Sequence, residues 1–201
     1  MNSSKEPSDE ILFQYVRFDD SNAFSELYNR YVRQLYNYGY RLCGDKALVQ
    51  DAVQDVFIEI WNRKQNLGEV KNAKAYLLSC VRRKISLVAK PETEANSYTR
   101  LCSVDESPYE QPMEDMTVSE ENLGQMVRCI RSQLESLPKR EHECVHLRFF
   151  EDLSYEEIAQ VMNITPQSAR NMVGKALARL RQSLPRHFFF SIRAAFLLLF
   201  L

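Results

Sequence analysis

The stretch SYEEIAQVMNITPQSARNMVGKALARLRQS, residues 154–183, predicts two helices joined by a short turn. Ser154 followed by Glu157 is a capping-box pattern, which opens the first helix. Thr165 is a good N-cap for the second helix, and Pro166 is a good first helical residue. A short helix followed by a capped, basic helix is typical of a helix-turn-helix.

The second of these helices has an apolar side and a polar side when its residues are placed at 100° intervals. The apolar side holds Ala169, Val173, Ala176, Leu177 and Leu180, with Met172 at its margin. The outward side holds Gln167, Ser168, Arg170, Asn171 and Lys175. Gln and Asn amides bond bidentately to adenine, Ser bonds to any base, and Arg pairs with guanine or phosphate. The pattern predicts a reader of the DNA major groove, with a plain helical hairpin as the alternative.

Charge is unevenly distributed along a chain of 201 residues whose net charge is only −1. Residues 71–90 carry six Lys/Arg and no acid, residues 91–122 carry nine Asp/Glu and one Arg, and residues 166–186 carry five Lys/Arg and no acid. Two basic segments separated by an acidic one indicate two cationic surfaces joined by an anionic tether. Such surfaces favour nucleic acid as a partner.

The composition favours a helical protein in a reducing compartment. Hydrophobic residues make up 45% of the chain, but there are only five Gly and seven Pro, which argues for helices over sheets. The five cysteines, at positions 43, 80, 102, 129 and 144, form no C-x-x-C pair and are odd in number. This predicts reduced thiols in a cytoplasm, not a disulfide framework. The polar start, MNSSKEPSDE, has no apolar signal core.

The first half of the chain predicts consecutive helices. Apolar residues recur at helical spacing through residues 21–43, and Gly44 can end that helix. Asp45 can cap the next helix, which runs to residue 62. A polar loop then leads to a helix over residues 73–90, whose end is cationic.

The helix that follows Asp45 has an unusual outward side. Its apolar side holds Val49, Val53, Val56, Phe57 and Ile60. Its outward side holds Asp51, Gln54, Asp55, Ile58 and Asn62. An isoleucine among carboxylates fits a contact with a partner, and a stray exposed apolar residue explains it equally well.

The predicted fold is all-α, with two small helical domains joined by an acidic linker and a helix-turn-helix in the C-terminal domain. We expect the first domain over residues 1–90 and the second over residues 118–186. Residues 91–117 are acidic, lack a hydrophobic period and contain Pro, which predicts a linker. Residues 187–201 form an apolar tail.

HECVH, residues 142–146, matches the zinc-peptidase motif H-E-x-x-H. On a helix, His142 and His146 could hold Zn²⁺, with Glu143 as the general base. A catalytic zinc needs a third protein ligand, and no Gly and further His follow as in the extended motif. Glu157 already serves as a cap partner. We therefore interpret the histidines as chance residues on a charged helix surface and predict no metal site.

The order of these motifs resembles a known family. DAVQDVFIEIW, AYLLSCVRRKI, an acidic segment and LPKREHECVHLRFFEDLSYEEIAQVMNITPQSARNMVGKALARLRQSL follow one another in the sequence. Together they resemble an RNA polymerase sigma factor of the sigma-70 family, extracytoplasmic-function (ECF) type, over roughly residues 20–185. The resemblance implies a factor that binds core polymerase and directs promoter-specific initiation. It argues against a peptidase and implies no catalytic activity and no cofactor.

The resemblance also implies roles for individual residues. The surface that binds the largest subunit of the polymerase matches Asp51, Gln54, Asp55 and Ile58. The element that opens and reads the −10 region matches the loop 65–70 and the following helix, with Lys74, Arg82, Arg83 and Lys84 as candidates. The −35 reader matches Gln167, Ser168, Arg170, Asn171 and Lys175. ECF factors often have Asn where Arg83 stands, so the base preference near −10 is open.

The expected partners are RNA polymerase core, promoter DNA and an anti-sigma factor, either membrane-bound or free. A helix-turn-helix regulator that acts without core is the alternative function. The apolar tail, residues 187–201, is too short for a membrane span of about 20 residues. It either covers an apolar face of one domain or belongs to an off-state that closes the two domains together or binds the anti-sigma factor.

Overall fold

The computed structural model describes residues 7–68, 70–88 and 131–183. Within these ranges the chain contains helices and no strand, and it divides into two compact units, Met1–Ser97 and Tyr98–Leu201. The predicted all-α class with two helical regions is confirmed. The predicted linker, residues 91–117, and the predicted tail, residues 187–201, lie outside the described residues.

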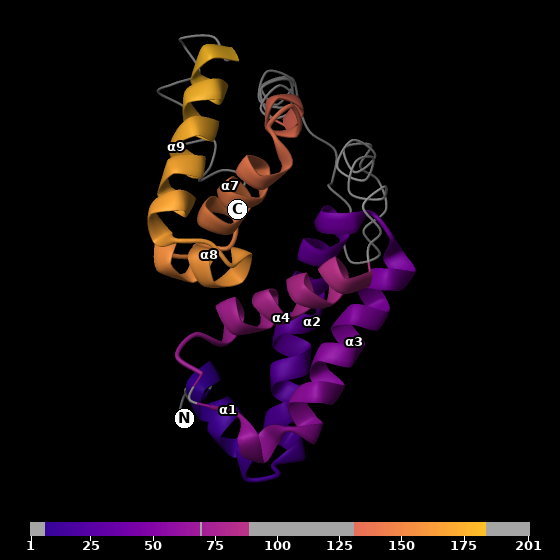
Figure 1. Cartoon of the computed structure of the whole chain (residues 1–201). Coiled ribbons are helices and arrows are strands. Elements are labelled where there is room, and N and C mark those ends of the chain that lie inside the picture. Colours follow the sequence, from indigo (N-terminus) through magenta and orange to yellow (C-terminus); the bar gives the residue numbers. More distant parts are fainter. Residues whose placement is uncertain (1–6, 69, 89–130, 184–201) are drawn as a thin grey trace, which may run out of the picture. The chain divides into compact units, whose positions relative to one another are not determined.

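The first unit is built around one long central helix. Its elements are α1 (Asp9–Arg17), α2 (Ser21–Cys43), α3 (Lys46–Asn62), the 3₁₀ turn η1 (Lys64–Asn66) and α4 (Ala73–Val88). Helix α2 packs against α1, α3 and α4, and α3 also packs against α4 (Figure 1). The three helices expected from the sequence between residues 21 and 90 are present, with α4 described as far as Val88.

Capping residues set the boundaries of these helices. The Asp20 side chain accepts hydrogen bonds from the first turn of α2. At the other end, Gly44 takes a left-handed conformation with φ 69°, which a residue without Cβ adopts at little cost. Asp45 then caps α3 by accepting from the backbone N–H of Leu48 at 3.1 Å. The roles predicted for Gly44 and Asp45 are confirmed.

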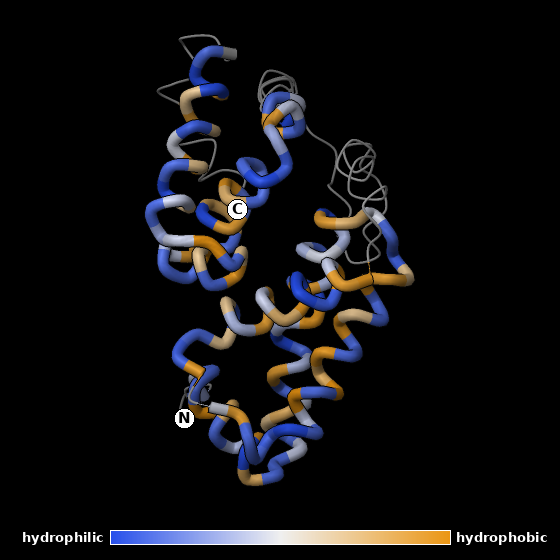
Figure 2. Tube along the Cα trace, in the orientation of Figure 1, coloured by the Kyte–Doolittle hydropathy of each residue, from blue (hydrophilic) through white to orange (hydrophobic). Residues whose placement is uncertain are grey.

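The helices of the first unit each bury an apolar stripe. Figure 2 shows hydrophobic residues recurring along the helices, between hydrophilic ones. At Gly39 on α2 the packing is tight: a Cβ there would lie 2.8 Å from Cγ1 of Val49 and 3.0 Å from Cδ1 of Ile85. Since Val49 lies on α3 and Ile85 on α4, the missing side chain lets both helices approach α2.

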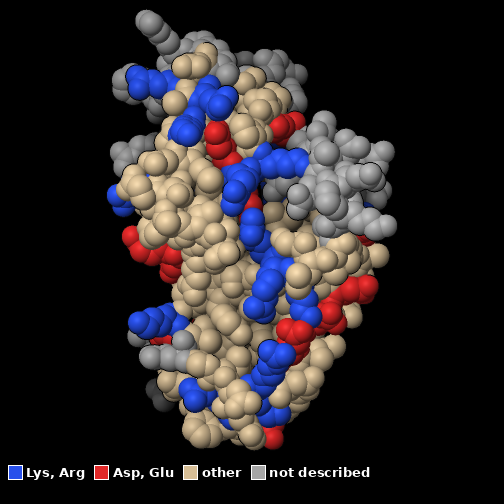
Figure 3. All heavy atoms as spheres, in the orientation of Figure 1, with Lys and Arg blue, Asp and Glu red and all other residues tan. Residues whose placement is uncertain are grey.

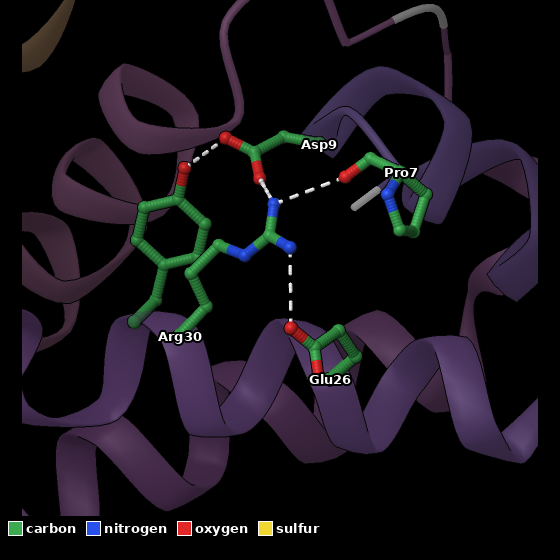
Figure 4. Close-up of polar contacts among 5 residues, drawn as sticks. Pro7, Asp9, Glu26 and Arg30 are labelled. Carbon is green, nitrogen blue, oxygen red and sulfur yellow. Dashed lines mark hydrogen bonds and ion pairs between the residues drawn. The ribbon is translucent and has the colours of Figure 1, made fainter. Parts of the chain in front are cut away.

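Helix α1 was missed by the sequence analysis. It buries Leu12, Phe13 and Val16, a spacing that follows the acidic first turn and could have indicated a short helix. Asp9 anchors it: the Arg30 guanidinium donates to Asp9 Oδ1 at 2.5 Å, and the Tyr31 hydroxyl donates to Asp9 Oδ2 (Figure 4). The tertiary contact to α2 therefore fixes a helix that is too short to be stable alone.

Arg30 gathers several acceptors around this anchor. Its guanidinium also donates to the Pro7 carbonyl at 3.2 Å and to the Glu26 carboxylate at 3.1 Å (Figure 4). The hydrogen bond to Asp9 raises the pKa of Arg30 above its ordinary value. Burial, with Asp9 as its acceptor, raises the pKa of the Tyr31 phenol. Both pKa shifts favour the charged Arg30 guanidinium and the neutral Tyr31 hydroxyl, whose hydrogen bonds to Asp9 hold α1 against α2.

Over its described residues, the second unit contains three full helices and one further helical segment. These helices are α7 (Lys139–Phe149), α8 (Tyr155–Met162) and α9 (Pro166–Ser183), and residues 131–135 are also helical. Helix α9 packs against both α7 and α8. One hydrophobic cluster consists of Leu134, Leu137, Val145, Ala176 and Leu180, with Phe149 and Phe150 packed against it.

The turn chemistry predicted for α8 and α9 is confirmed. Glu157 N–H donates to Ser154 Oγ at 3.2 Å, and Ser154 N–H donates to the Glu157 carboxylate at 2.7 Å, which completes the capping box. Asn163 ends α8 with φ 53°. Thr165 Oγ1 accepts from the backbone N–H of Ser168 at 3.1 Å and caps α9. The capping box, the left-handed Asn163 and the Thr165 cap together fix the geometry of the helix-turn-helix.

One residue of the second unit differs from expectation. Leu177, assigned to the buried side of α9, is 37% exposed, because the buried stripe of this helix runs through Ala169, Val173, Ala176 and Leu180. Within the described part of the chain, no helix is long and apolar enough to cross a membrane.

Replacing Asp9 should loosen the first unit. We expect Asp9→Ala to lower its free energy of unfolding by about 1–2 kcal/mol, because a charge-assisted hydrogen bond is lost in a half-buried site. Trp61 is the only tryptophan of the chain and lies on α3, so its fluorescence during urea unfolding reports on this unit. Glu10→Ala, an exposed change in the same turn, is the control. Equal effects of the two variants would contradict the anchor.

Candidate nucleic-acid interface

Helix α9 presents the predicted reading face to solvent. Gln167, Arg170, Asn171 and Lys175 are exposed, and Ser168 is half-buried. The opposite stripe is buried at Ala169, Val173, Ala176 and Leu180. A Cβ added at Gly174 would meet no atom within 4 Å, so the backbone of α9 is open at this point of the exposed side. All five side chains predicted for the −35 contact therefore belong to one helix whose other side is packed.

Hydrogen bonds within α9 hold part of this face in a defined arrangement. Gln167 Nε2 donates to Asn171 Oδ1 at 2.9 Å, one turn further along the helix. The hydroxyls of Thr165 and Ser168 lie 2.8 Å apart and share a hydrogen bond. The Asn171 amide group keeps its own N–H donors for another acceptor. This arrangement presents both donors and acceptors, as contact with base edges requires.

An aromatic ring lies beside the basic part of the same surface. The Arg170 guanidinium lies 5.1 Å from the centre of the Tyr155 ring, and that of Arg148 lies 5.4 Å from it. Arg148 also donates to the Leu153 carbonyl at 2.8 Å. Sequence analysis missed Tyr155, because the contact joins the first residue of α8 to the side of α9.

The four residues predicted for polymerase binding share one exposed side of α3. Asp51, Gln54 and Asp55 are exposed, and Ile58 is 55% exposed. Figure 3 shows acidic side chains gathered over α3 with basic side chains next to them. The exposure of Ile58 is the one that both sequence interpretations predict, a contact with a partner and a stray exposed apolar residue.

The four cations predicted for the −10 contact do not lie on one side of α4. At 100° per residue, Arg82 and Lys84 lie on opposite flanks of Arg83. Arg83 is exposed, whereas Lys74, Arg82 and Lys84 are half-buried. Arg83 therefore has the outward position, and the other three are partly covered by the packing of the unit.

Lys84 joins α4 to α3. Its ammonium lies 2.5 Å from Glu59 Oε1 and 3.4 Å from Asp55 Oδ2. The hydrogen bond between Lys84 and Glu59 raises the pKa of the lysine and lowers the pKa of the carboxyl group. Asp55 and Lys84 were assigned to different surfaces, and the structure brings them together. Glu59 was not among the predicted residues.

Two family models match the chain. The model of sigma-70 region 2 matches residues 27–86, and the model of sigma-70 region 4 matches residues 127–180. The first segment covers most of α2 together with α3 and most of α4, and the second contains α7, α8 and most of α9. Together the two segments make up more than half of the chain.

The chain belongs to the sigma-70 family of RNA polymerase sigma factors. Its relatives place it with the ECF type. It is 28% identical to the ECF RNA polymerase sigma factor SigE of Mycolicibacterium smegmatis over 197 residues, which cover 90% of this chain and 71% of the relative. It is 23% identical to the ECF RNA polymerase sigma factor SigM of Bacillus subtilis, over 79% of this chain and 93% of the relative.

Solved structures share the fold of this sigma factor. CnrH, in complex with the cytosolic domain of CnrY, superposes with a TM-score of 0.57 at 19% identity, over 87% of this chain and 95% of that chain. The sigma factor RpoE, in complex with the anti-sigma factor NepR from Bartonella quintana, gives a TM-score of 0.54 at 18% identity, over 79% and 94%. At these identities the likeness concerns the fold alone.

The family membership argues against the peptidase interpretation of HECVH, and the structure corrects the description of α7 as a charged surface helix. The helix is not a charged surface helix, because Glu143 and His146 are buried and Cys144 is fully enclosed. His146 Nε2 lies 3.3 Å from Glu151 Oε1. Among the described residues, no group of three or more His, Cys, Asp or Glu side chains could hold a metal ion.

Proposed function

We propose that this sigma factor reads the −35 duplex with α9, contributes to −10 opening with α4, and binds core polymerase with the outward side of α3. The observation that carries the proposal is the exposed face of Gln167, Arg170, Asn171 and Lys175 on a helix whose opposite stripe is buried. A helix-turn-helix places its second helix in the major groove, where such side chains meet base edges.

The reading face divides into base contacts and phosphate contacts. We assign Asn171 and Gln167 to bases, since their linked amides present donors and acceptors together. Ser168 lies beside them at the start of the helix. We assign Lys175 to phosphate, because a flexible ammonium is a point charge without a fixed fork. Arg170 can serve either kind of contact.

For core binding we propose the α3 surface of Asp51, Gln54, Asp55 and Ile58. An exposed apolar residue surrounded by polar groups is the composition of an interface core with a polar rim. For the −10 contact we propose Arg83 as the leading residue of the set Lys74, Arg82, Arg83 and Lys84. Its support is its outward position, while Lys84 already contacts Glu59 and Asp55.

The partners of the protein follow from these roles. They are core polymerase, promoter DNA and an anti-sigma factor, the last supported by the complex of the sigma factor RpoE with the anti-sigma factor NepR. We propose a cytoplasmic location, where the polymerase and the promoter are. In this proposal the chain itself catalyses no reaction and needs no cofactor, because the polymerase performs the chemistry.

Run-off transcription with purified core tests the function as a whole. On a template that carries the DNA upstream of its own operon, we expect a discrete transcript only when both core and this chain are present. The free chain should bind the same duplex poorly in a gel shift. Tight binding without core, together with no transcript, would instead favour the helix-turn-helix regulator.

Changes on α3 should weaken binding to core without unfolding the chain. We expect Asp51→Lys and Ile58→Asp each to raise the dissociation constant for core roughly tenfold, by charge reversal and by loss of an apolar contact. Fluorescence anisotropy of labelled chain, titrated with core, measures it. Gln14→Lys, an exposed change on α1, is the control. Unchanged affinity in both α3 variants would assign core binding to another surface.

Substitutions on α4 should distinguish the role of Arg83 in promoter opening from that of Lys84. We expect Arg83→Ala to reduce promoter opening severalfold with little effect on recruitment, because its side chain is exposed. Lys84→Ala should reduce opening less, since it removes a contact between α3 and α4. Permanganate reactivity of thymines near −10 measures opening, with Arg17→Ala on α1 as the charge-matched control. An equal loss in both α4 variants would assign Lys84 to DNA as directly as Arg83.

Changes on α9 should separate sequence reading from charge attraction. We expect Asn171→Ala to cost about 1–3 kcal/mol at one −35 base pair and little at the others. Lys175→Ala should weaken binding to all promoter variants alike. It should also reduce the slope of log affinity against log salt concentration by about one, because one phosphate contact is lost. Holoenzyme binding to a panel of −35 variants at several salt concentrations measures both. Indistinguishable profiles for the two variants would contradict the division.

A further inference from the structure

Tyr155 stands outside the reading face but touches it. It is the first residue of α8, and its half-buried ring lies 5.1 Å from the Arg170 guanidinium on α9. Arg170 is exposed and belongs to the reading face. The contact therefore joins a residue that the sequence analysis assigned no role to one of the five side chains assigned to DNA.

The Tyr155 ring has a well-defined position. The capping box of Ser154 and Glu157 fixes the backbone at the start of α8 through hydrogen bonds of 3.2 and 2.7 Å. A second guanidinium, that of Arg148, lies 5.4 Å from the same ring and is held by the Leu153 carbonyl at 2.8 Å. Arg148 is thus tethered to the backbone, and Arg170 is the cation at this ring that extends from α9.

A ring in this position restricts a long side chain that would otherwise sample many rotamers. The negative face of an aromatic ring attracts a guanidinium, and the planar guanidinium loses less freedom for each hydrogen bond once it is oriented. Its N–H donors point outward in the guanidinium plane and remain available for an acceptor. Orientation before binding reduces the entropy lost in the complex.

We propose that Tyr155 is a positioning residue that holds Arg170 ready for its contact with promoter DNA. The inference rests on the proposed role of α9 as the −35 reader. The ring acts through Arg170, and the Tyr155 hydroxyl has no part in the effect. The aromatic face is therefore the required property at position 155.

A double-mutant cycle in the holoenzyme tests this inference. Promoter affinity is measured with core and full-length chain for Tyr155→Phe, Tyr155→Leu, Arg170→Ala and the double variant Tyr155→Leu/Arg170→Ala. We expect Tyr155→Phe to match the wild type and Tyr155→Leu to weaken binding about two- to fivefold, the range of an exposed cation–π contact. The double variant should bind like Arg170→Ala alone, because the ring has nothing left to position.

Three results would overturn the inference. If Tyr155→Phe lowers promoter affinity as much as Tyr155→Leu, the hydroxyl acts directly. If the affinity losses multiply in the double variant, Tyr155 acts independently of Arg170. If Tyr155→Leu has the affinity of the wild type, Tyr155 has no role in binding. Thermal melting of each variant checks folding, and Tyr155→Met replaces Leu if Leu destabilises the domain. A wild-type holoenzyme without promoter binding would instead reject the proposed function.

Discussion

The first unit depends on the close approach of α3 and α4 to α2 at Gly39. A Cβ at that position would lie 2.8 Å from Cγ1 of Val49 and 3.0 Å from Cδ1 of Ile85, so any larger residue would force these side chains to shift. Because those two residues must face inward, the rotation of both helices about their axes is fixed. The side of α3 that carries Asp51 then faces solvent, and so does Arg83 on α4. A packing constraint thus determines which side chains are available to partners.

The parts of the fold that could be predicted are those whose signal is local. The turn between α8 and α9 and the break at Gly44 depend on residues within a few positions of one another. The period of α9 indicates the buried side of that helix, with Leu177 as the exception. Helix α1, with nine residues, is too short to give a clear periodic signal. Its stability comes from Asp9 meeting Arg30 and Tyr31, more than twenty positions further along the chain, and no periodicity reveals that contact.

The arrangement of the candidate residues could be predicted from the sequence where a single helix carries them. All five residues on α9 share a side, whereas the cations of α4 do not, because family resemblance supplied their roles and not their directions. The contacts that a residue makes with a neighbouring helix could not be predicted either. Glu59 reaches Lys84 from α3, and the helix that carries HECVH proved to be core, since α8 and α9 cover it. The sequence alone does not show whether a charged residue is buried in the folded protein.

The shared contact of Lys84 with Asp55 and Glu59 limits what a substitution at Asp55 can show. Asp55 belongs to the surface proposed for core binding, and its carboxylate lies 3.4 Å from a lysine proposed for the −10 contact. Removing that carboxylate leaves Lys84 with Glu59, and a lysine placed there would repel Lys84 across the two helices. A loss of opening in such a variant would combine two causes. Asp51 and Ile58 lie on the same side of α3, and the contacts of Lys84 are with Asp55 and Glu59. The two surfaces are therefore separable at those positions, and Asp55 is where they are coupled.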